Sequence, residues 1–346
     1  MTAPSWAVIL AGGVGSRFWP VSTPQRPKQL LPLVDDDPLL INALDRLAPL
    51  VPLERTLILT SAALAPAILA ACPIPAENVL VEPVPAGTAA ALAWAALAVE
   101  RRAGPATPMI CVHADWAIGD AAAFRAALAS AATVASRYER LVTVGIVPVR
   151  PDIGYGYIKL GPAVEPGVFA VDRFVEKPDR ARAEQMVAEG CLWNSGIFAW
   201  RAGDFLREVR LRSPEVSPAL AHPDDAAAFF AAVTQPLAVD VAVLERSDRI
   251  LALPGAFAWD DVGTWAALRR VRTCDPAGNA VHGPVHLEDA TGNVVHAEGN
   301  AVVMYGVQDL VVVTRDGLTL VTTVDRAADL KTLLDRLPAS VRERPA

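Results

Sequence analysis

The sequence contains few cysteines, and none of them lies in a pattern typical of zinc binding or of a disulfide framework. Cys72, Cys111, Cys191 and Cys274 are far apart, with no Cys-x-x-Cys pair and no histidine at ligand spacing. We therefore expect reduced and mostly buried thiols.

The sequence also lacks an excess of positive charge and a long apolar run. Its formal net charge of -7 argues against non-specific binding to nucleic acid or anionic membranes, because such binding relies on clustered Lys and Arg. Residues 1–5 carry no basic stretch, and the apolar run after them is too short for a secretory or membrane-spanning segment. These absences predict a cytoplasmic protein without a nucleic-acid or membrane partner.

Strands and helices alternate along the first half of the chain. This pattern predicts parallel βαβ units, and hence a Rossmann-like α/β fold with a mixed, mostly parallel open sheet and helices on both faces. Ligands of such sheets bind at the carboxyl ends of the strands, which selects the turns that begin at Ala11, Glu82 and Ala114. The expected strands are 56–60, 78–81, 109–113 and 141–146, and the expected helices are 39–50, 62–71, 88–102 and 121–138.

The pattern changes twice in the second half. From about residue 151, β-rich runs predict a continuation of the same sheet, with strands at 155–160, 168–175 and 192–200 and a helix at 179–189. After residue 275, short apolar segments separated by turns predict a small β-rich domain, either a β-solenoid or a sandwich, closed by a helix at 327–337. The expected domains are therefore 1–275 and 276–346. The short segments are 281–287, 292–297, 301–305, 310–314 and 318–323.

The most informative stretch is the glycine-rich turn that follows the apolar run 6–10. Gly12, Gly13 and Gly15 precede Ser16 and Arg17, and Lys28 follows one loop later. Glycines let consecutive N–H groups converge on an anion, and the two cations add fixed positive charge, so the stretch suits a polyphosphate. It is neither a P-loop nor a dinucleotide fingerprint, since Phe18 stands where the third glycine of the fingerprint would be.

A second turn carries an acidic residue at a predicted strand end. Glu82 precedes Gly87 and Thr88, which open a helix, so Thr88 is a predicted N-cap. A carboxylate in this position can accept hydrogen bonds from both N1–H and the 2-amino group of guanine, a pair that adenine and uracil lack. Losing that contact costs ~1–3 kcal/mol. An ordinary strand-to-helix loop would also account for Thr88, although it does not require Glu82.

The glycine-rich turn resembles a family signature. Gly-Gly-x-Gly-x-Arg followed by Pro-Lys-Gln is similar to the signature of sugar nucleotidyltransferases, and the stretches 18–22 and 27–30 resemble their mannose-1-phosphate guanylyltransferase branch, which makes GDP-mannose. The resemblance implies GTP and mannose 1-phosphate as substrates and Mg²⁺ as cofactor. The family also carries Glu-Pro after the expected strand 78–81 and reads the base there, so the resemblance implies that Glu82 selects the base, with the Gly87 N–H available to it. A nucleotidyltransferase for another sugar or base, or a catalytically silent homologue, remains an alternative.

The resemblance extends to two aspartates. Asp115, which from its residues alone also fits a turn or a cap, lies in a segment similar to the Pro-Ala-Asp-His of the family, whose aspartate binds Mg²⁺. Asp261 matches the second metal-binding aspartate of a Trp-x-Asp-x-Gly segment, with Asp260 as the alternative ligand. Two carboxylates together with substrate phosphates are a usual way to hold Mg²⁺.

Two further motifs imply a sugar phosphate site. Glu176 and Lys177, otherwise typical of a solvated surface pair, stand in a stretch similar to the Phe-x-Glu-Lys-Pro of the family; Glu176 would bind sugar hydroxyls and Lys177 the phosphate. Asn194 and Gly196, which also fit a tight turn, lie in another segment similar to the family, and Gly156 precedes both motifs.

The sequence shows no Ser-His-Asp or Cys-His arrangement, and the implied reaction needs none. The attacking phosphate oxygen is already ionised, so Arg17, Lys28 and Lys177 are expected to act by positioning and charge stabilisation. The C-terminal β-rich domain is a candidate surface for a homodimer.

Overall fold

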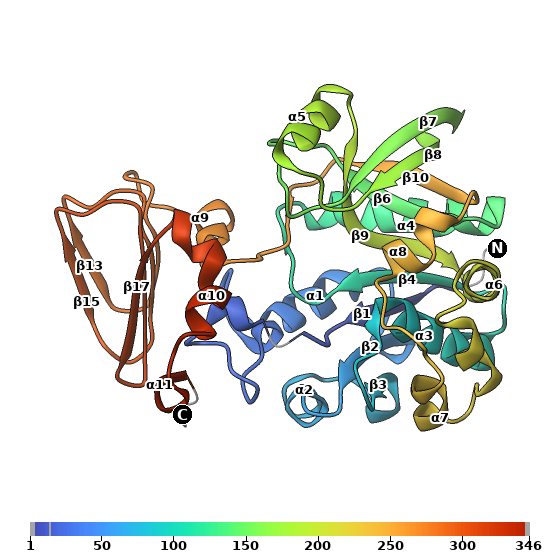
Figure 1. Cartoon of the computed structure of the whole chain (residues 1–346), viewed down its shortest axis with the longest axis horizontal. Coiled ribbons are helices and arrows are strands. Elements are labelled where there is room, and N and C mark those ends of the chain that lie inside the picture. Colours follow the sequence, from blue (N-terminus) through green and yellow to red (C-terminus); the bar gives the residue numbers. More distant parts are fainter. Residues whose placement is uncertain (1–3, 14, 343–346) are drawn as a thin grey trace. The chain divides into compact units, whose positions relative to one another are not determined.

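The computed structural model describes residues 4–13 and 15–342 (Figure 1). Contacts divide this part of the chain into two compact units. The sheet unit consists of the residues up to Gly12, Leu44–Ala114 and Ile118–Trp259; the solenoid unit consists of Gly13–Ala43, Asp115–Ala117 and the residues from Asp260 onward. The solenoid unit therefore includes the glycine-rich turn and does not begin at residue 276.

The sheet unit is built on one nine-stranded mixed sheet. Seven strands run in one direction, while β8 and β9 run in the other, so the predicted mostly parallel sheet is confirmed. In spatial order the strands are β3 (Val79–Glu82), β2 (Thr56–Ser61), β1 (Trp6–Leu10), β4 (Pro108–His113), β9 (Leu192–Arg201), β6 (Leu141–Ile146), β10 (Ile250–Gly255), β8 (Val168–Val175) and β7 (Tyr157–Glu165).

Helices cover both faces of this sheet because the central strands are apolar on both sides. All residues of β1 are buried. Trp6, Val8 and Leu10 pack in one cluster with helices α3 and α6, whereas α4 packs across β4, β6, β9 and β10. The helices are α1 (Leu39–Leu47), α2 (Ala65–Ala71), α3 (Gly87–Ala103), α4 (Ala121–Tyr138), α5 (Arg180–Ala188), α6 (Ala202–Arg212), α7 (Ala226–Ala231) and α8 (Val239–Ala242).

Short elements complete these segments. The strands β5 (Ala117–Ile118) and β11 (Trp259–Asp260) pair with each other. The 3-10 helices are η1 (Ser16–Phe18), η2 (Lys28–Leu30), η3 (Leu53–Arg55), η4 (Ala76–Asn78), η5 (Ser217–Ala221), η6 (Leu244–Arg246) and η7 (Trp265–Ala267). Of the cysteines, Cys72, Cys111 and Cys191 are buried and Cys274 is partly exposed.

The C-terminal part of the solenoid unit is made of stacked β coils. Strands β12 (Ala280–His282), β14 (Val294–Ala297) and β16 (Leu310–Arg315) pair in parallel, and β17 (Leu318–Thr323) folds back on β16. Strands β13 (Val285–Glu288) and β15 (Val302–Tyr305) form a second parallel pair. Parallel ladders between successive turns of chain identify the solenoid rather than the sandwich.

Two expectations for this region were wrong in detail. The single strand expected at 281–287 is two strands, because Gly283 adopts φ +89° and a Cβ there would overlap the Ala297 carbonyl. The helix expected at 327–337 is a 3-10 helix η8 (Asp325–Asp329) followed by α10 (Leu330–Leu334). The same unit also contains α9 (Leu268–Val271), α11 (Ala339–Arg342) and residues 39–43 of α1. No helix of the described residues is long and apolar enough to cross a membrane.

Candidate functional site

The glycine-rich turn is shaped by the side chain of Lys28. Gly15 adopts φ +74°, and a Cβ at this position would overlap the Lys28 side chain, so only glycine fits. Gly13 has open space around it, and Ser16 begins η1. Val14 lies outside the described residues. The turn therefore allows backbone to pass close to a lysine that is itself buried.

Lys28 is the central cation of the solenoid unit. Its side chain is 7% exposed, and its Nζ lies 2.8 Å from Asp115 Oδ2 and 3.1 Å from the carbonyl oxygen of Asp261. The ammonium also lies 5.4 Å from the centroid of the Phe18 ring. Arg17 is exposed and donates to the Gly263 carbonyl at 3.3 Å. The structure thus brings Arg17, Lys28, Asp115 and Asp261 together in one unit.

The neighbouring aspartates 260 and 261 have different partners. Asp260 is 6% exposed; its Oδ2 accepts from Arg270 Nε at 2.7 Å, and its Oδ1 accepts from the Val262 N–H at 2.9 Å. Val262 is fully buried at φ +46°, a strained conformation for a β-branched residue. Asp261 accepts from the Gly263 N–H at 3.2 Å. Asp260 therefore stabilises the turn that presents Asp261.

Two oxygen atoms around Lys28 are of the kind that bind divalent cations. The Asp115 carboxylate and the Asp261 backbone already surround a positive charge, and carboxylate oxygens are the ligands that Mg²⁺ prefers. Within the described residues no group of three or more His, Cys, Asp or Glu could hold a metal ion. A cation here would take its other ligands from substrate phosphates and water.

Glu82 stands at the end of β3 in the sheet unit, close to the backbone of Gly12. A Cβ on Gly12 would lie 3.6 Å from Glu82 Oε1. Burial raises the pKa of Glu82 to about 7, so this carboxyl group changes its charge near neutral pH. A partner that donates hydrogen bonds would favour the ionised form.

The loop after Glu82 differs from expectation at Thr88. The prediction that Thr88 is the N-cap of α3 was wrong: α3 begins at Gly87, and the Thr88 hydroxyl accepts from the Val239 N–H at 2.9 Å. The start of α8 supplies a donor that the sequence does not reveal. Gly87 adopts φ +81°, and a Cβ there would overlap the Leu237 backbone. Close packing against Leu237 therefore requires glycine at position 87.

The residues predicted to bind the sugar phosphate also lie together in the sheet unit. A Cβ on Gly156 would lie 2.5 Å from Glu176 Oε2 and 3.4 Å from Asn194 Cβ. Lys177, at φ +44°, donates to Glu176 Oε1 at 2.6 Å. The Asn194 Oδ1 accepts from the Gly196 N–H at 3.3 Å. The glycine at 156 leaves room beside the Glu176 and Asn194 side chains.

Sequence reasoning missed Asp240, on α8. Its Oδ1 accepts from Asn194 Nδ2 at 2.6 Å, which fixes the orientation of the Asn194 amide. Burial raises the pKa of Asp240, and the negative charge of Glu176 raises it further. The available signal was a single aspartate in the otherwise apolar run 237–244, which on its own also fits a helix terminus.

Comparison with known proteins gives consistent matches. The nucleotidyl transferase family model matches residues 6–276. Proteins named mannose-1-phosphate guanylyltransferase from Salmonella muenchen and Escherichia coli are each 35% identical over 97% of this chain and 74% of their own length. A Thermus thermophilus crystal structure, described as a mannose-1-phosphate geranyltransferase, matches with a TM-score of 0.89 and 34% identity over 96% of this chain and 99% of that chain.

Proposed function

The chain belongs to the mannose-1-phosphate guanylyltransferases of the nucleotidyl transferase family, and we propose that it transfers a guanylyl group from GTP to mannose 1-phosphate, giving GDP-mannose and pyrophosphate. The observation that carries this proposal is the buried Lys28 ammonium between Asp115 and Asp261, beside a glycine turn that leaves no room for a side chain at Gly15. This arrangement suits a triphosphate better than a neutral ligand.

The reaction is an in-line displacement at the α-phosphorus. A phosphate oxygen of mannose 1-phosphate forms the new P–O bond, the bond from the α-phosphorus to the oxygen that bridges to the β-phosphate breaks, and pyrophosphate leaves with that electron pair. No general base is needed because the attacking oxygen is already ionised. Arg17 and Lys28 stabilise negative charge on the triphosphate, and Lys177 binds the phosphate of the sugar.

Base selection is assigned to Glu82. Its carboxylate accepts from N1–H and the 2-amino group of guanine, and the Gly87 N–H is assigned to the base as well. The absence of a side chain at Gly12 leaves room beside Glu82 Oε1. Support comes from the position of Glu82 at the end of β3, at the edge where sheets of this kind bind ligands.

Sugar recognition is assigned to Glu176, Asn194 and the two glycines beside them, 156 and 196. Glu176 accepts hydrogen bonds from sugar hydroxyls, which requires Lys177 to leave its contact with Glu176 and turn to the phosphate. Asn194 both donates to and accepts from vicinal hydroxyls. Asp240 keeps the Asn194 amide in place.

The cofactor is assigned as Mg²⁺, held by Asp115 and Asp261. Bound there, the ion would neutralise phosphate charge and polarise the α-phosphorus. Asp260 is the weaker candidate because both of its oxygens already accept hydrogen bonds from Arg270 or the Val262 N–H. Metal binding by Asp115 would also release Lys28 toward the triphosphate.

One assay tests the whole assignment. Purified protein with MgCl₂ is given each of the four nucleoside triphosphates together with mannose or glucose 1-phosphate, and pyrophosphate release is measured. We expect release with GTP and mannose 1-phosphate. Absence of release with every pair would leave a catalytically silent homologue, and preference for UTP or dTTP would remove Glu82 from its assigned role.

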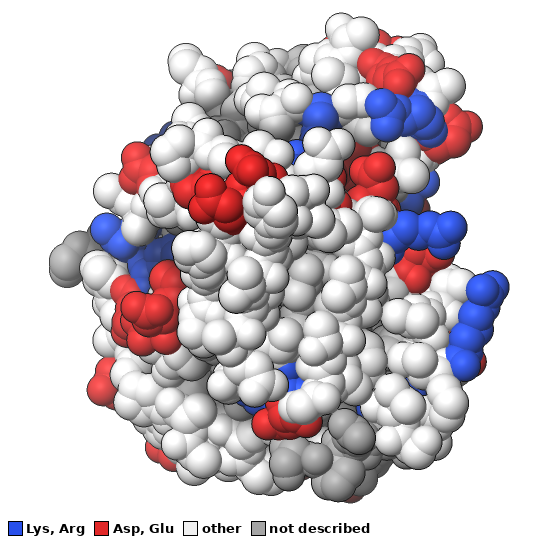
Figure 2. Space-filling view, turned by 90° about the vertical axis from the view of Figure 1, so that its left-hand side faces the viewer, with Lys and Arg blue, Asp and Glu red and all other residues white. Residues whose placement is uncertain are grey.

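We further propose that the protein works in the cytoplasm as a homodimer, with small-molecule substrates and without nucleic-acid or membrane partners. Val303, Tyr305 and Val321 of the solenoid are 72%, 72% and 58% exposed and line one groove of about 530 Å³. Figure 2 shows a broad uncharged area on this face, with charged side chains around it. Apolar exposure of this kind, next to the edge strand β17, is typical of an interface.

The oligomeric state is measured by sedimentation velocity. The unmodified chain is expected to sediment as a dimer and Tyr305→Glu as a monomer, while Leu211→Glu, a change at an exposed position of α6 in the sheet unit, stays dimeric. A monomeric unmodified chain would contradict the dimer.

A further inference from the structure

The segment from Arg26 to Leu33, which carries Lys28, is held at both ends by side chains from the C-terminal part of the solenoid unit. At one end, Arg26 Nη1 donates to Glu298 Oε2 at 2.6 Å. At the other, Arg272 Nε donates to the Leu33 carbonyl at 2.7 Å. Both partners are more than 230 residues away in sequence from the segment that they hold.

These two anchors are joined to each other through His296. Arg272 Nη2 lies 3.1 Å from His296 Nδ1, and His296 Nε2 lies 3.0 Å from Glu298 Oε1. An arginine can only donate, so Nδ1 accepts and the proton of the neutral imidazole is on Nε2, where it donates to Glu298. One continuous chain of hydrogen bonds therefore runs from Leu33 through Arg272, His296 and Glu298 to Arg26.

The surroundings make this chain of contacts rigid. His296 is fully buried, stacks on His282 with ring centroids 4.5 Å apart, and packs against Trp265 at 5.3 Å. Burial lowers the pKa of His296, which favours the neutral ring that the contacts require. The Glu298 side chain is 23% exposed. Each of its two oxygens has a different donor, so both ends of the segment depend on it.

Two neighbouring contacts fix the chain just before this segment. Arg315 Nη1 donates to the Val21 carbonyl at 2.7 Å, and its Nε lies 3.8 Å from Glu298 Oε2. Trp265 Nε1 donates to the Trp19 carbonyl at 3.1 Å. The backbone on the N-terminal side of Lys28 is thus already restrained, and Arg26 sets how the chain continues from it.

We infer that Glu298 is a positioning residue for Lys28: through Arg26 and the His296–Arg272 chain, the solenoid holds the Lys28 segment in the geometry that phosphate binding requires. The inference rests on the role proposed for Lys28 in the reaction. It gives the solenoid a part in catalysis, although Glu298 itself touches no substrate. Misplacement of a charged group by about 1 Å can cost a hundredfold in rate, so the contact is sensitive to small changes.

The test is a kinetic double-mutant cycle with Glu298→Gln and Lys28→Ala. Glutamine replaces one of the two acceptor oxygens of Glu298 with an NH₂ group, which only donates, so the Arg26 and His296 contacts cannot both be kept in place. The kcat for pyrophosphate release is therefore expected to fall about tenfold to a hundredfold, while KM for mannose 1-phosphate changes little. In the Lys28→Ala background, Glu298→Gln is expected to cause no further fall. Glu288→Gln, at an exposed position of β13 in the same solenoid, is the matched control and keeps full activity.

The outcomes separate the inference from its premise. Full activity of Lys28→Ala would overturn the role proposed for Lys28. An impaired Lys28→Ala with an unimpaired Glu298→Gln would overturn the positioning role, as would an equal loss from Glu298→Gln in both backgrounds, which a merely structural role would give. Rates are taken per folded molecule from thermal unfolding curves. Should Glu298→Gln fail to fold, Arg26→Gln removes the ion pair between Arg26 and Glu298 by changing the more exposed partner, whose side chain is 31% exposed. This variant is expected to give the same kinetics.

Discussion

At the scale of single residues, the adjacent aspartates Asp260 and Asp261 make different contacts. Asp260 accepts hydrogen bonds from Arg270 and from the N–H of the strained Val262, whereas Asp261 faces the Lys28 ammonium with its backbone carbonyl. The sequence motif alone could not show which aspartate has which role, because the two side chains are chemically identical and differ only in the residues that contact them. The structure therefore gives Asp260 a role in the turn, and Asp261 stays the proposed metal ligand.

Replacing each aspartate with asparagine should separate these roles. Asp261→Asn is expected to lower kcat by about a hundredfold, because the carboxylate proposed to bind the metal is lost. The free energy of unfolding is expected to change little, because the asparagine oxygen can still accept from the Gly263 N–H. Asp260→Asn is expected to destabilise the fold by about 1–3 kcal/mol while turnover per folded molecule stays near normal, since the amide oxygen can still accept from the Val262 N–H. Urea unfolding and pyrophosphate release measure both quantities, and reversed results would make Asp260 the ligand.

The raised pKa of Glu82 predicts pH-dependent nucleotide binding. Burial raises this pKa to about 7, so the carboxyl group is mostly protonated at pH 6 and mostly ionised at pH 8. Only the ionised form accepts both guanine donors, so the affinity for GTP is expected to rise with pH, by about tenfold from pH 6 to pH 8. Calorimetric titrations measure the affinity at each pH.

Glu82→Gln provides the control for that experiment. The phosphates of GTP also ionise in this pH range, and the variant retains their contribution while losing that of Glu82. The variant is therefore expected to show a much flatter pH dependence. Equal slopes for both proteins would exclude Glu82 as the group responsible.

Much of the candidate site could be predicted from sequence, because the predicted residues lie in short motifs whose members are local. The contacts that hold them are not local. Asp240, which accepts from the Asn194 amide, lies 46 residues from it in sequence. The Val239 N–H donates to the hydroxyl of Thr88, which is 151 residues away in sequence. No periodicity or spacing reports such contacts, so the supporting residues were missed even where the motif residues were identified.

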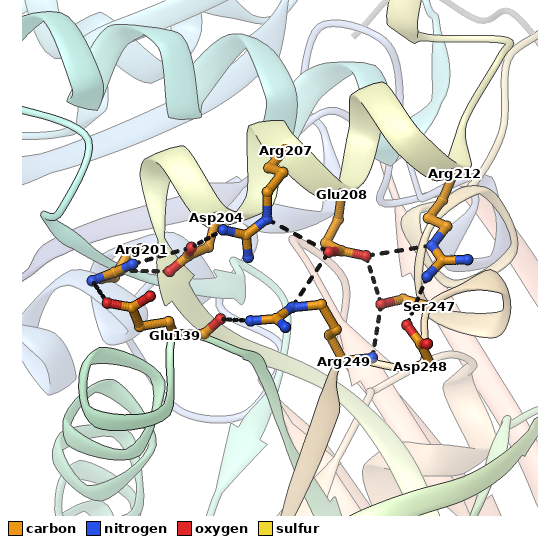
Figure 3. Close-up of polar contacts among 9 residues, drawn as sticks. All are labelled: Glu139, Arg201, Asp204, Arg207, Glu208, Arg212, Ser247, Asp248 and Arg249. Carbon is orange, nitrogen blue, oxygen red and sulfur yellow. Dashed lines mark hydrogen bonds and ion pairs between the residues drawn. The ribbon is translucent and has the colours of Figure 1, made fainter.

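At the scale of elements, α6 illustrates how a charged helix is buried. Asp204 and Glu208 of this helix are 3% and 1% exposed, and Figure 3 shows arginines gathered around both. Glu208 accepts from the Ser247 hydroxyl at 2.8 Å and lies 3.6 Å from Arg212 Nε and 3.7 Å from Arg249 Nε. The network ties α6 to the residues before β10.

Glu208→Ala is expected to lower the free energy of unfolding by about 1–3 kcal/mol, because the Ser247 hydroxyl and the surrounding guanidinium groups lose a buried acceptor. Asp248→Ala is the matched control: Asp248 is 79% exposed and pairs with Arg212, and exposed pairs of this kind are worth at most ~1 kcal/mol. Denaturant unfolding measures both. Equal losses in the two variants would show that burial of Glu208 adds nothing.

Several element boundaries were predicted to the residue, in the sheet unit and in the solenoid, where the expected strand 318–323 agrees with β17. The expected helix 121–138 and the expected strands 141–146 and 168–175 agree with α4, β6 and β8 to the residue. In the solenoid, the segment expected at 281–287 and the closing helix expected at 327–337 were predicted less well. The strands there are only three to six residues long, and each coil packs on neighbouring coils, which the local sequence does not report. The chain turns at Gly283, where it passes close to the Ala297 carbonyl of the next coil, and this turn divides one expected strand into two.

At the scale of the whole molecule, Arg17, Lys28 and the residues assigned to the metal belong to the solenoid unit, and the residues assigned to the base and to the sugar phosphate belong to the sheet unit. The boundary expected at residue 275 is the point where the sequence changes from longer elements to short apolar segments separated by turns. It cannot show that residues 13–43 pack in one apolar cluster with residues that come after 260, such as Phe18 with Val294 and Val311.

A fragment of residues 1–275 is accordingly expected to be inactive. It would lose Glu298 and Arg315 and expose Phe18, Leu31 and Leu33, which are buried in the full chain. Pyrophosphate release and solubility are compared with those of the full chain purified in parallel. A soluble fragment with the kcat of the full chain would show that the solenoid is dispensable for catalysis.

The composition of the solenoid unit also has a consequence for synthesis on the ribosome. Its first segment ends at Ala43, and its last begins at Asp260. At roughly 5–20 residues per second, roughly 10–40 s pass between the emergence of these two segments. During that interval Asp115 is made, but Asp261 and Gly263, which contact Lys28 and Arg17 in the folded chain, are still missing. The segment proposed to bind phosphate is thus made long before the residues that contact it, so a nascent chain is expected to bind GTP only after Asp260 and the residues that follow it have left the ribosome.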